Sequence, residues 1–489
     1  MPLAFAIAGL VACGGDSPPG SDDRCIPQCN DHCDGRGDSC GGSCTSCPAG
    51  QGCAQGACSV CESNDACGAE CSDCSAQASN RWCVDRQRCG CQLDSDCAEG
   101  EVCDGGSCRA CEADACVRSE LYPGGWSPGY TAPGGEFLHD FSYAGYRLGE
   151  GELPQPSGSE ASVLDHGADA SGSSDSRGAF QAAIDAVAAS GGTVVVPAGD
   201  YRIDGGLLVT SSNTVIKGAG VDKSKVFFTT HGGEWADRGH LAFRGTIAIE
   251  GDSQLIADAE ALTTELEVAD ASLFEVGDDV AIGWILSEGF LLEHGMENHW
   301  DHSLDLYKVF FRRQVVAVQP PNRIVVDVPM RYPALMRDSA SVRLERGFLR
   351  EVGVQGLSLS NAAPSVEDAE AVSKTKLVHF RGVKDAWVRD LSSYQSPLAG
   401  GDCGRDDDQD RGCHLQSRGI EVEESARVTI RDTVLERAQH LGAGGNGYLF
   451  VVRYSDEVLV DSCVGTRGRH NFITDGDFSS SGVVFRNNR

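Results

Sequence analysis

The sequence predicts a mainly β chain whose longest part is a solenoid of stacked parallel strands. Short apolar runs recur late in the sequence, and each run carries inward apolar residues followed by polar ones. These inward residues are Val354 and Leu357, Ala386 and Val388, Val428 and Ile430, Val458 and Val460, and Val483 and Phe485. The steps from 428 to 458 and from 458 to 483 are 30 and 25 residues, a spacing that fits one solenoid coil. A β-sandwich is the alternative, but it predicts longer alternating strands joined by hairpin turns.

Length and charge narrow the classes of protein. The chain has 489 residues, 24 of them Cys, and 72 acidic side chains against 40 basic ones, a net charge of -32. That length suggests about three folding units. No apolar run reaches the roughly 18 residues that a membrane-spanning helix needs. The acidic excess repels phosphate backbones, so nucleic acid is not an expected partner.

The first residues predict export. A short apolar stretch over residues 2–12 ends in Leu10-Val11-Ala12, directly before Cys13. This arrangement resembles the lipobox of bacterial lipoproteins, in which the cysteine is acylated and becomes the mature N-terminus. The resemblance implies a signal over 1–13, a flexible tether over 14–24, and a lipid anchor at Cys13 that holds the protein at the cell surface or outer membrane. The alternative is an ordinary apolar N-terminus with an unmodified cysteine.

Residues 25–117 predict a disulfide-stapled region. Twenty of the 24 cysteines lie between Cys25 and Cys116, and part of their pattern recurs at a shift of 50 residues. Several pairs have the spacing of zinc ligands, but almost no His accompanies them, and an oxidising compartment favours disulfides. Among the later cysteines, Cys403 and Cys413 are expected to close one short loop by a disulfide. Cys463 is then left as a buried free thiol.

An amphipathic helix opens the solenoid. Residues 118–160, rich in Gly, Pro and aromatic side chains, predict an ordered, extended lead-in. Asp175 then occupies an N-cap position, and apolar residues follow at helical spacing through Ser190 before Gly191-Gly192 ends the run. These apolar residues are Phe180, Ala183, Ile184, Val187 and Ala188. Strand-like runs at 193–196 and 214–217 come next.

This succession resembles the opening of right-handed parallel β-helix enzymes of the pectate-lyase superfamily, in particular the rhamnogalacturonase and epimerase-type pectate-lyase-like domain. The residues that carry the resemblance are Gly167-Ala168-Asp169, Asp175, Gly191-Gly192-Thr193-Val194, Pro197-Ala198-Gly199-Asp200-Tyr201 and Lys217-Gly218-Ala219-Gly220. The resemblance implies a right-handed single-stranded parallel β-helix over 161–489 and a polysaccharide substrate in a groove along it. The helix would cap the N-terminal end, where the stack would otherwise expose an apolar surface.

Residues 246–350 interrupt the coil pattern. Two strands joined by a turn are predicted at 265–268 and 276–282, and a second pair of strands is predicted at 314–318 and 323–327. They predict a small β unit inserted between coils. The connection at 293–302 is dense in His and acidic side chains, and it is either a metal site or a solvated loop that faces substrate.

Register predicts one polar cluster, because residues at the same offset in successive coils stack about 4.8 Å apart. His440 lies ten residues after Ile430 and His470 ten residues after Val460, so the two imidazoles are expected to stack. On the same count Asp475 and Asp477 lie level with the glycines that flank Asn446. The expected substrate-binding side chains of this cluster are Arg469, Asn471, Asn446, Tyr448 and His414. The alternative is a structural ladder of histidines at a coil turn.

Two reactions could use the cluster, with Asp475, Asp477, His470 and His440 as its catalytic candidates. Glycoside hydrolysis needs two carboxyl groups, for which Asp475 and Asp477 are the pair. A polysaccharide lyase needs a base such as His470 or Tyr448 and a cation for the developing charge. Residues 426–489 contain eight Arg and seven acidic side chains, so the net charge of this segment does not repel a negatively charged uronate polymer. A complete catalytic signature is missing, so a non-catalytic surface carbohydrate-binding or adhesive lipoprotein stays an alternative.

Two expectations concern the end of the chain. The acidic loop 402–413 could bind Ca²⁺ through Asp406, Asp407, Asp408 and Asp410, or could be a solvated insertion. The chain stops at Arg489, directly after the strand run at 483–485, with nothing to cover the last coil. An uncovered coil exposes unpaired backbone groups. The sequence therefore predicts further coils beyond Arg489 or a second chain as a cap.

Overall fold

The computed structural model describes residues 121–122, 126–149, 151–155, 158–300, 303–398, 403, 412–476, 478 and 480–489, together with eight short strands between Gln51 and Ala110. The chain divides into two compact units, Met1–Leu138 and His139–Arg489. Among these described residues, no helix is long and apolar enough to cross a membrane. The expected lipidation site Cys13, the signal and the tether lie outside the described residues.

The first unit contains a repeated β-hairpin. Strands β1 (Gln51–Ala54) and β2 (Ala57–Val60) pair antiparallel, and β7 (Glu101–Asp104) and β8 (Ser107–Ala110) repeat the pairing fifty residues later. The two register partners Cys53 and Cys58 recur as Cys103 and Cys108, and Cys108 is disulfide-bonded. Two shorter hairpins lie between them, β3 (Ala66–Cys67) with β4 (Ser72–Asp73) and β5 (Trp82–Val84) with β6 (Arg88–Gly90). The shift of 50 seen in the sequence is therefore a repeat of one hairpin.

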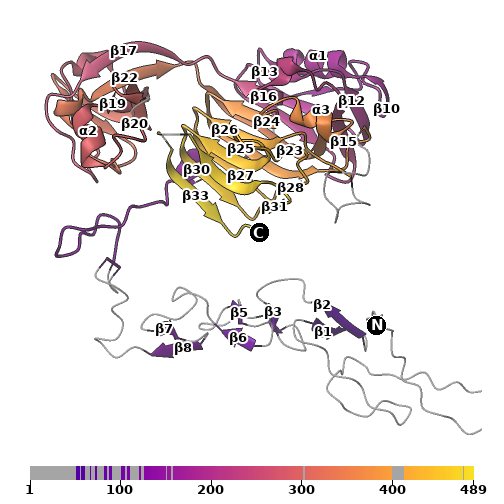
Figure 1. The fold of residues 1–489 in the computed structure, drawn as a ribbon, viewed down its shortest axis with the longest axis horizontal. Coiled ribbons are helices and arrows are strands. Elements are labelled where there is room, and N and C mark those ends of the chain that lie inside the picture. Colours follow the sequence, from indigo (N-terminus) through magenta and orange to yellow (C-terminus); the bar gives the residue numbers. More distant parts are fainter. Residues whose placement is uncertain are drawn as a thin grey trace, which may run out of the picture. The chain divides into compact units, whose positions relative to one another are not determined.

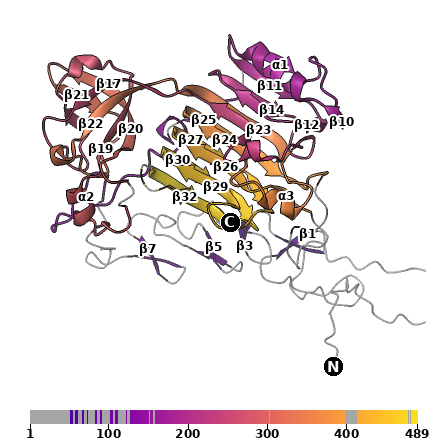
Figure 2. The ribbon, with the colours of Figure 1, turned by 45° about the horizontal axis from the view of Figure 1, so that its top comes forward.

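The second unit is a parallel β-helix, and the predicted fold class is confirmed (Figure 1). Its longest sheet, here sheet 1, runs in the order β10 (Ser171–Asp175), β12 (Gly199–Ile203), β15 (Ser224–Phe228), β23 (Leu349–Ser360), β25 (Val383–Ser393), β27 (Ala426–Arg431), β30 (Asp456–Asp461) and β33 (Ser481–Arg486). A second parallel sheet, sheet 2, runs in the order β13 (Leu207–Val209), β16 (Gly239–Arg244), β24 (Lys376–Arg381), β26 (Arg418–Glu423), β29 (Tyr448–Arg453) and β32 (His470–Asp475). Figure 2 shows β24, β26, β29 and β32 as neighbouring strands. Five shorter strands pair beside sheet 1, β9 (Ser159–Ser162), β11 (Gly192–Val196), β14 (Thr214–Gly218), β28 (Val434–Glu436) and β31 (Val464–Thr466).

The predicted apolar periodicity is the register of sheet 1. Val388, Ile430, Val460 and Phe485 stack in successive coils, and so do Ala386, Val428, Val458 and Val483. Val354 and Leu357 are both buried, as expected. Val354 stacks on Val388, and Leu357 stacks on Leu391 farther along the long strand β23. The buried Val388, Ile430 and Val460 side chains each contribute about 1.5–3 kcal/mol, whereas Phe485 is 39% exposed.

The capping helix is present as α1 (Arg177–Val187). It buries the four apolar residues Phe180, Ala183, Ile184 and Val187 and packs on β9, β11 and β13. The N-cap is Ser176, one residue later than expected, and the Asp175 carboxylate accepts a hydrogen bond from the Arg177 amide at 2.9 Å. The helix ends at Val187 rather than Ser190. The apolar face of the helix thus follows from its spacing, while its ends differ by a few residues.

The predicted insert is an antiparallel sheet of six strands. Its order is β17 (Ala248–Gln254), β22 (Ser341–Arg346), β19 (Asp279–Ile285), β20 (Tyr307–Gln319), β21 (Arg323–Val326) and β18 (Glu265–Glu267). The expected hairpin of β20 and β21 is confirmed. The expected pairing of the first two strands was wrong, because β18 pairs with β21 while β19 lies between β20 and β22. A short helix, α2 (Glu288–Glu293), and aromatic side chains around Trp284 complete the insert core.

Buried charged side chains join the insert to the β-helix. The Arg313 side chain of β20, 0% exposed, lies 3.3 Å from Glu457 and 3.7 Å from Asp456 of β30. Lys384 of β25 pairs with Asp279 of β19. Burial raises the pKa of Asp456 to about 7 although Arg313 opposes that shift. Because these charges have lost most of their contact with water, each depends on its partner being present.

Candidate active site

Sheet 2 carries polar side chains on its outer face. Strands β24, β26, β29 and β32 keep one register, while alternate residues such as Phe380, Val422 and Val452 belong to the core. Three positions of each strand carry these outer-face side chains. The first residues of the four strands are Lys376, Arg418, Tyr448 and His470, and the fourth residues are His379, Glu421, Val451 and Ile473. The sixth residues are Arg381, Glu423, Arg453 and Asp475. Seven of these side chains form what is here called the charged array: Lys376, His379, Arg418, Glu421, Glu423, Arg453 and Asp475.

Arg418 is the centre of the charged array. Its side chain is 1% exposed and pairs with the Glu421 carboxylate and, at 2.9 Å, with Asp475 Oδ2. Its Nε donates a hydrogen bond to the Gly445 carbonyl at 2.6 Å. Its guanidinium carbon also lies 5.1 Å from the centroid of the Tyr448 ring, within range of a cation–π contact. Arg418 thereby links three successive strands of sheet 2.

Tyr448 and His470 form a ring pair at the exposed end of the array. They are register partners across β29 and β32, and their ring centroids lie 4.8 Å apart in an edge-to-face arrangement. Tyr448 is 9% exposed, while His470 and its neighbour Arg469 are exposed. Arg469 Nη1 donates a hydrogen bond to the Gly442 carbonyl at 2.6 Å. A phenol and an imidazole therefore lie together, and the exposed Arg469 directly precedes His470 in the chain.

The expected stacking of His440 on His470 was wrong. Eleven residues separate β28 from β29, whereas three residues separate β31 from β32. His440 therefore lies in the longer turn, while His470 opens a strand and is level with Tyr448. His440 is 8% exposed, and burial lowers its pKa. The 30-residue step from Ile430 to Val460 in sheet 1 therefore does not carry over to sheet 2, where the partners Tyr448 and His470 are 22 residues apart.

The same turn displaces the expected partners of Asp475. Asp475 is level with Arg453 and not with the glycines around Asn446. Its Oδ2 lies 2.9 Å from Arg418 and 3.6 Å from Arg453, and its Oδ1 accepts a hydrogen bond from the Gly476 amide at 3.0 Å. Asp477, the other predicted carboxylate, lies outside the described residues.

Three predicted substrate-binding residues have structural partners instead. The Asn446 side chain, 2% exposed, accepts hydrogen bonds from the Lys374 amide and the Ser417 hydroxyl. Asn471 Oδ1 accepts one from the Gly468 amide at 3.0 Å. His414 is 9% exposed, its Nδ1 lies 3.0 Å from Ser393 Oγ, and it is level with Arg437 rather than His440. These side chains shape turns and the coil interior.

Sequence reasoning missed the buried members of the charged array. Lys376 lies 3.4 Å from Glu421, and His379 Nε2 lies 2.9 Å from Glu423 Oε2. Burial opposes ionisation of Glu423, but the hydrogen bond from His379 and nearby positive charges lower its pKa to about 2. A signal was available, because all four strands begin with Lys, Arg, Tyr or His and carry a charged side chain at their sixth position.

Metal binding is not assigned to this site. The ligand atoms of His379, Glu421 and Glu423 lie within 4.8 Å of one another, a spacing that a transition metal could bridge. However, Lys376, Arg418 and Arg453 already surround the two carboxylates with positive charge. The four predicted calcium ligands Asp406, Asp407, Asp408 and Asp410 lie outside the described residues. In the insert, both ring nitrogens of His294 are occupied, by the Phe290 carbonyl and the Tyr332 hydroxyl.

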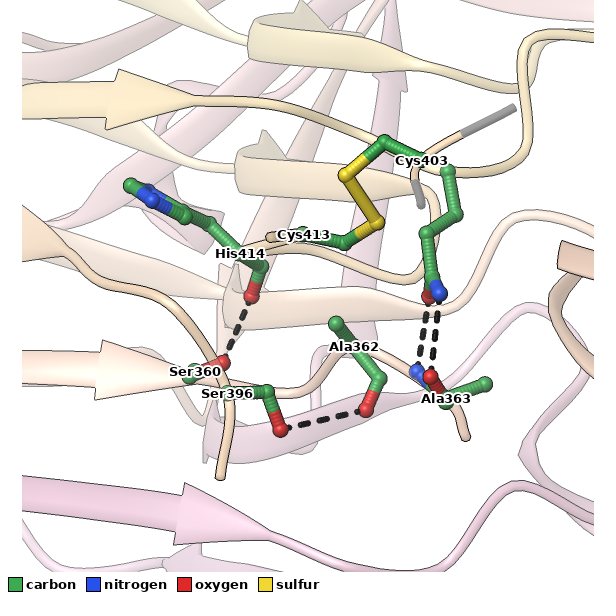
Figure 3. Close-up of a disulfide and its surroundings, with 8 residues drawn as sticks. Ser360, Ala362, Ala363, Ser396, Cys403, Cys413 and His414 are labelled. Carbon is green, nitrogen blue, oxygen red and sulfur yellow. Dashed lines mark hydrogen bonds between the residues drawn. A yellow bond between two sulfur atoms is a disulfide. The ribbon is translucent and has the colours of Figure 1, made fainter. Parts of the chain in front are cut away.

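The predicted disulfide between Cys403 and Cys413 is confirmed, with the two Cα atoms 5.4 Å apart. Figure 3 shows it beside Ala362 and Ala363, with the His414 ring pointing away from the sulfur atoms. The His414 carbonyl accepts a hydrogen bond from Ser360 Oγ at 2.8 Å. Cys463 is the predicted buried free thiol, and burial raises its pKa to about 12. Disulfides of this kind are typical of proteins outside a reducing cytosol.

Replacing His414 with Asn is expected to reduce the acid sensitivity of the fold. Burial lowers the pKa of His414 from 6.5 to about 4 in the folded protein. As the pH falls below 6.5, the unfolded chain takes up a proton that the folded chain does not yet bind, so stability is lost. The loss is on the order of 2–3 kcal/mol by about pH 4. Urea unfolding at neutral and acidic pH measures it.

The control for this experiment is His166→Asn, at an exposed histidine of the same unit. We expect the free energy of unfolding of this variant to keep the pH dependence of the wild type. An unchanged pH dependence in His414→Asn as well would contradict the prediction.

Comparison with known proteins supports the family resemblance in the first coils of the β-helix. Residues 161–261 match the family described as rhamnogalacturonase A/epimerase, pectate lyase-like, so the resemblance seen in the sequence is confirmed. The mannuronan C5-epimerase AlgE3 of Azotobacter vinelandii is 48% identical over 71 residues, which cover 13% of this chain and 4% of that protein. Alginate lyase 7 of the same organism is 43% identical over 74 residues, covering 14% and 9%. The chain therefore spans less than a tenth of these relatives.

A solved structure is also similar. The tailspike protein gp49 from Pseudomonas phage LKA1 matches 67% of this chain and 51% of its own, with a TM-score of 0.47 and 16% identity. Residues 161–261 of the second unit thus match a pectate-lyase-like family, and the strand order of the unit is that of a parallel β-helix.

Proposed function

We propose that this protein is an exported enzyme that removes the proton next to the carboxylate of a uronate-containing polysaccharide. The observation that carries the proposal is the Tyr448 and His470 ring pair, 4.8 Å between centroids, with the exposed Arg469 directly before His470 in the chain. Two groups that exchange protons and one that holds an anion are what this reaction needs. The relatives named as a mannuronan epimerase and an alginate lyase support this choice of chemistry.

Three residues have separate roles in the proposed reaction. Arg469 binds the uronate carboxylate and stabilises the negative charge that develops when the neighbouring C–H bond breaks. His470 accepts that proton, and Tyr448 supplies a proton from its hydroxyl. In a lyase the bond to the leaving glycosidic oxygen breaks, a carbon–carbon double bond forms, and the oxygen takes the proton. In an epimerase the proton from the Tyr448 hydroxyl adds to the same carbon from the face opposite His470, and no bond to oxygen breaks.

The geometry supports hydrolysis less well. A hydrolase needs one carboxyl group that protonates the leaving oxygen and a second that acts as base or nucleophile. Both oxygens of Asp475 are already engaged, Oδ2 by two arginines and Oδ1 by the Gly476 amide. Asp475 therefore suits a role in holding Arg418, and through it Tyr448, in place.

A panel of uronate and neutral polysaccharides tests the proposal. A lyase produces unsaturated ends that absorb ultraviolet light, an epimerase changes the uronate composition without shortening the polymer, and a hydrolase releases reducing ends without the absorbance. We expect the first or second outcome on a uronate polymer. Release of reducing ends alone would contradict the proposed chemistry. Binding without turnover would instead support a non-catalytic carbohydrate-binding protein.

We further propose that Cys13 carries a lipid that anchors the exported protein to a membrane. The apolar stretch before Cys13 and the disulfide chemistry later in the chain support this. Cys13→Ala is expected to abolish incorporation of labelled palmitate and to move the protein from the detergent phase to the aqueous phase on phase separation. Cys463→Ala, at the buried thiol, is the matched control and should keep the label. Label retained in Cys13→Ala would refute the anchor.

A further inference from the structure

The inserted β unit contacts the end of the site strand β32 through one aromatic side chain. Phe478 lies three residues after Asp475 and is 8% exposed. Although it belongs to the last coil of the β-helix, it packs in the hydrophobic core of the insert. Its ring lies 4.7 Å from that of Trp300, edge to face, and 6.0 Å from that of Phe310. Lys308 of the insert places its ammonium group 5.6 Å from the same ring.

The short connection limits how far Asp475 can move. Three residues span at most about 10 Å, so an anchored Phe478 restrains Asp475 directly. Gly476, between them, has a φ of +105°, and a Cβ there would lie 2.8 Å from the Tyr454 ring. The carbonyl of Tyr454 in turn accepts a hydrogen bond from Arg312 of the insert at 2.5 Å. The insert thus contacts this turn from two directions.

A second contact holds the far side of the same segment. Arg331 of the insert pairs with Glu457 and donates a hydrogen bond to Ser481 Oγ at 3.2 Å, where β33 begins. Residues of the insert therefore contact Phe478 in the connection and Ser481 at its end. Asp475, at the start, instead pairs with Arg418, whose guanidinium lies over the Tyr448 ring.

From these contacts we propose that the insert positions the active site, with Phe478 as the positioning residue. The Phe478 ring, held between Trp300 and Phe310, sets the place of Asp475, which sets Arg418 and with it the Tyr448 and His470 pair. Phe478 itself touches no reacting group. As far as it concerns catalysis, this inference rests on the proposed function, but the restraint on β32 is a property of the fold and can be measured without substrate.

The test combines hydrogen–deuterium exchange with kinetics on the full-length chain. Phe478→Ala is expected to speed amide exchange at least tenfold in residues 470–476, and to lower kcat more than tenfold with a KM change of less than threefold. Phe478→Leu, which keeps an apolar side chain of similar size, should recover most of both effects. Trp300→Ala should reproduce the Phe478→Ala result from the insert side, and the double variant should add little to either single one.

Ile324→Val is the matched control, because Ile324 is 0% exposed in the same insert core and loses only a methylene. It should leave exchange in 470–476 and kcat at wild-type values. If Phe478→Ala instead speeds exchange only in the insert strands, Phe478 merely stabilises the insert and the inference is wrong. If the wild type turns over no polymer, the proposed function fails, and the exchange rates of 470–476 alone decide the inference.

Discussion

His470→Ala is expected to lower kcat on a uronate polymer by about 10²–10⁴-fold, the usual contribution of a general acid–base residue. His470 is exposed at the start of β32, so its removal leaves no cavity in the core. Its ring lies edge to face with Tyr448 at 4.8 Å, which places the two proton-transfer groups together. Steady-state kinetics, with thermal unfolding to verify the fold, measure the effect. Tyr448→Phe, which removes only the hydroxyl, should cause a loss of similar size.

His440→Asn is the discriminating control. A constant coil length predicts that His440 stacks on His470, whereas the structure places it in the eleven-residue turn before β29. We therefore expect His440→Asn to change kcat by less than tenfold. Equal losses from His440→Asn and His470→Ala would support the register inferred from sequence and would contradict this site.

Arg313→Met is expected to destabilise the second unit by about 3–5 kcal/mol, the usual cost of removing one partner from a buried ion pair. The Arg313 side chain is 0% exposed and lies 3.3 Å from Glu457 and 3.7 Å from Asp456. It also donates a hydrogen bond to the Val328 carbonyl at 3.1 Å. Without it, two buried carboxylates face each other with less compensating charge. Urea unfolding, followed by circular dichroism, measures the loss.

Arg343→Met is the matched surface control. Arg343 pairs with Asp252 at 2.9 Å in the same insert, but the two side chains are 29% and 44% exposed. Solvent screens such a pair, so we expect a loss of about 0–1 kcal/mol. Similar losses in the two variants would show that burial of the ionic interface has no special energetic role.

The parts of the fold that depend on short-range pattern were predictable from sequence. The apolar residues of α1 have the spacing of one helix face, and the structure buries four of them. The inward residues of β25, β27, β30 and β33 have a period of two within each strand and recur once per coil. The disulfide of Cys403 with Cys413 and the buried Cys463 followed from counting cysteines.

The parts that depend on long-range pairing were not predictable. In the insert, β18 pairs with β21 and not with β19, the next strand in the sequence. At the site, Arg418 meets Asp475 across 57 residues, a contact that exists only once the strands of sheet 2 are in register. No local pattern contains that information, because it depends on how many residues each turn uses.

By itself, the sequence determined which residues face the core, where the capping helix lies, and that Tyr448 and His470 belong to one polar cluster. These follow from periods of two and 3.6 residues and from coil spacing, which are properties of neighbouring residues. Only the tertiary structure decided that His470 meets Tyr448 rather than His440, and that Arg418 holds Asp475. The physical reason is that hydrogen bonds fix strands against strands, while turns of eleven and of three residues both satisfy the same ladder.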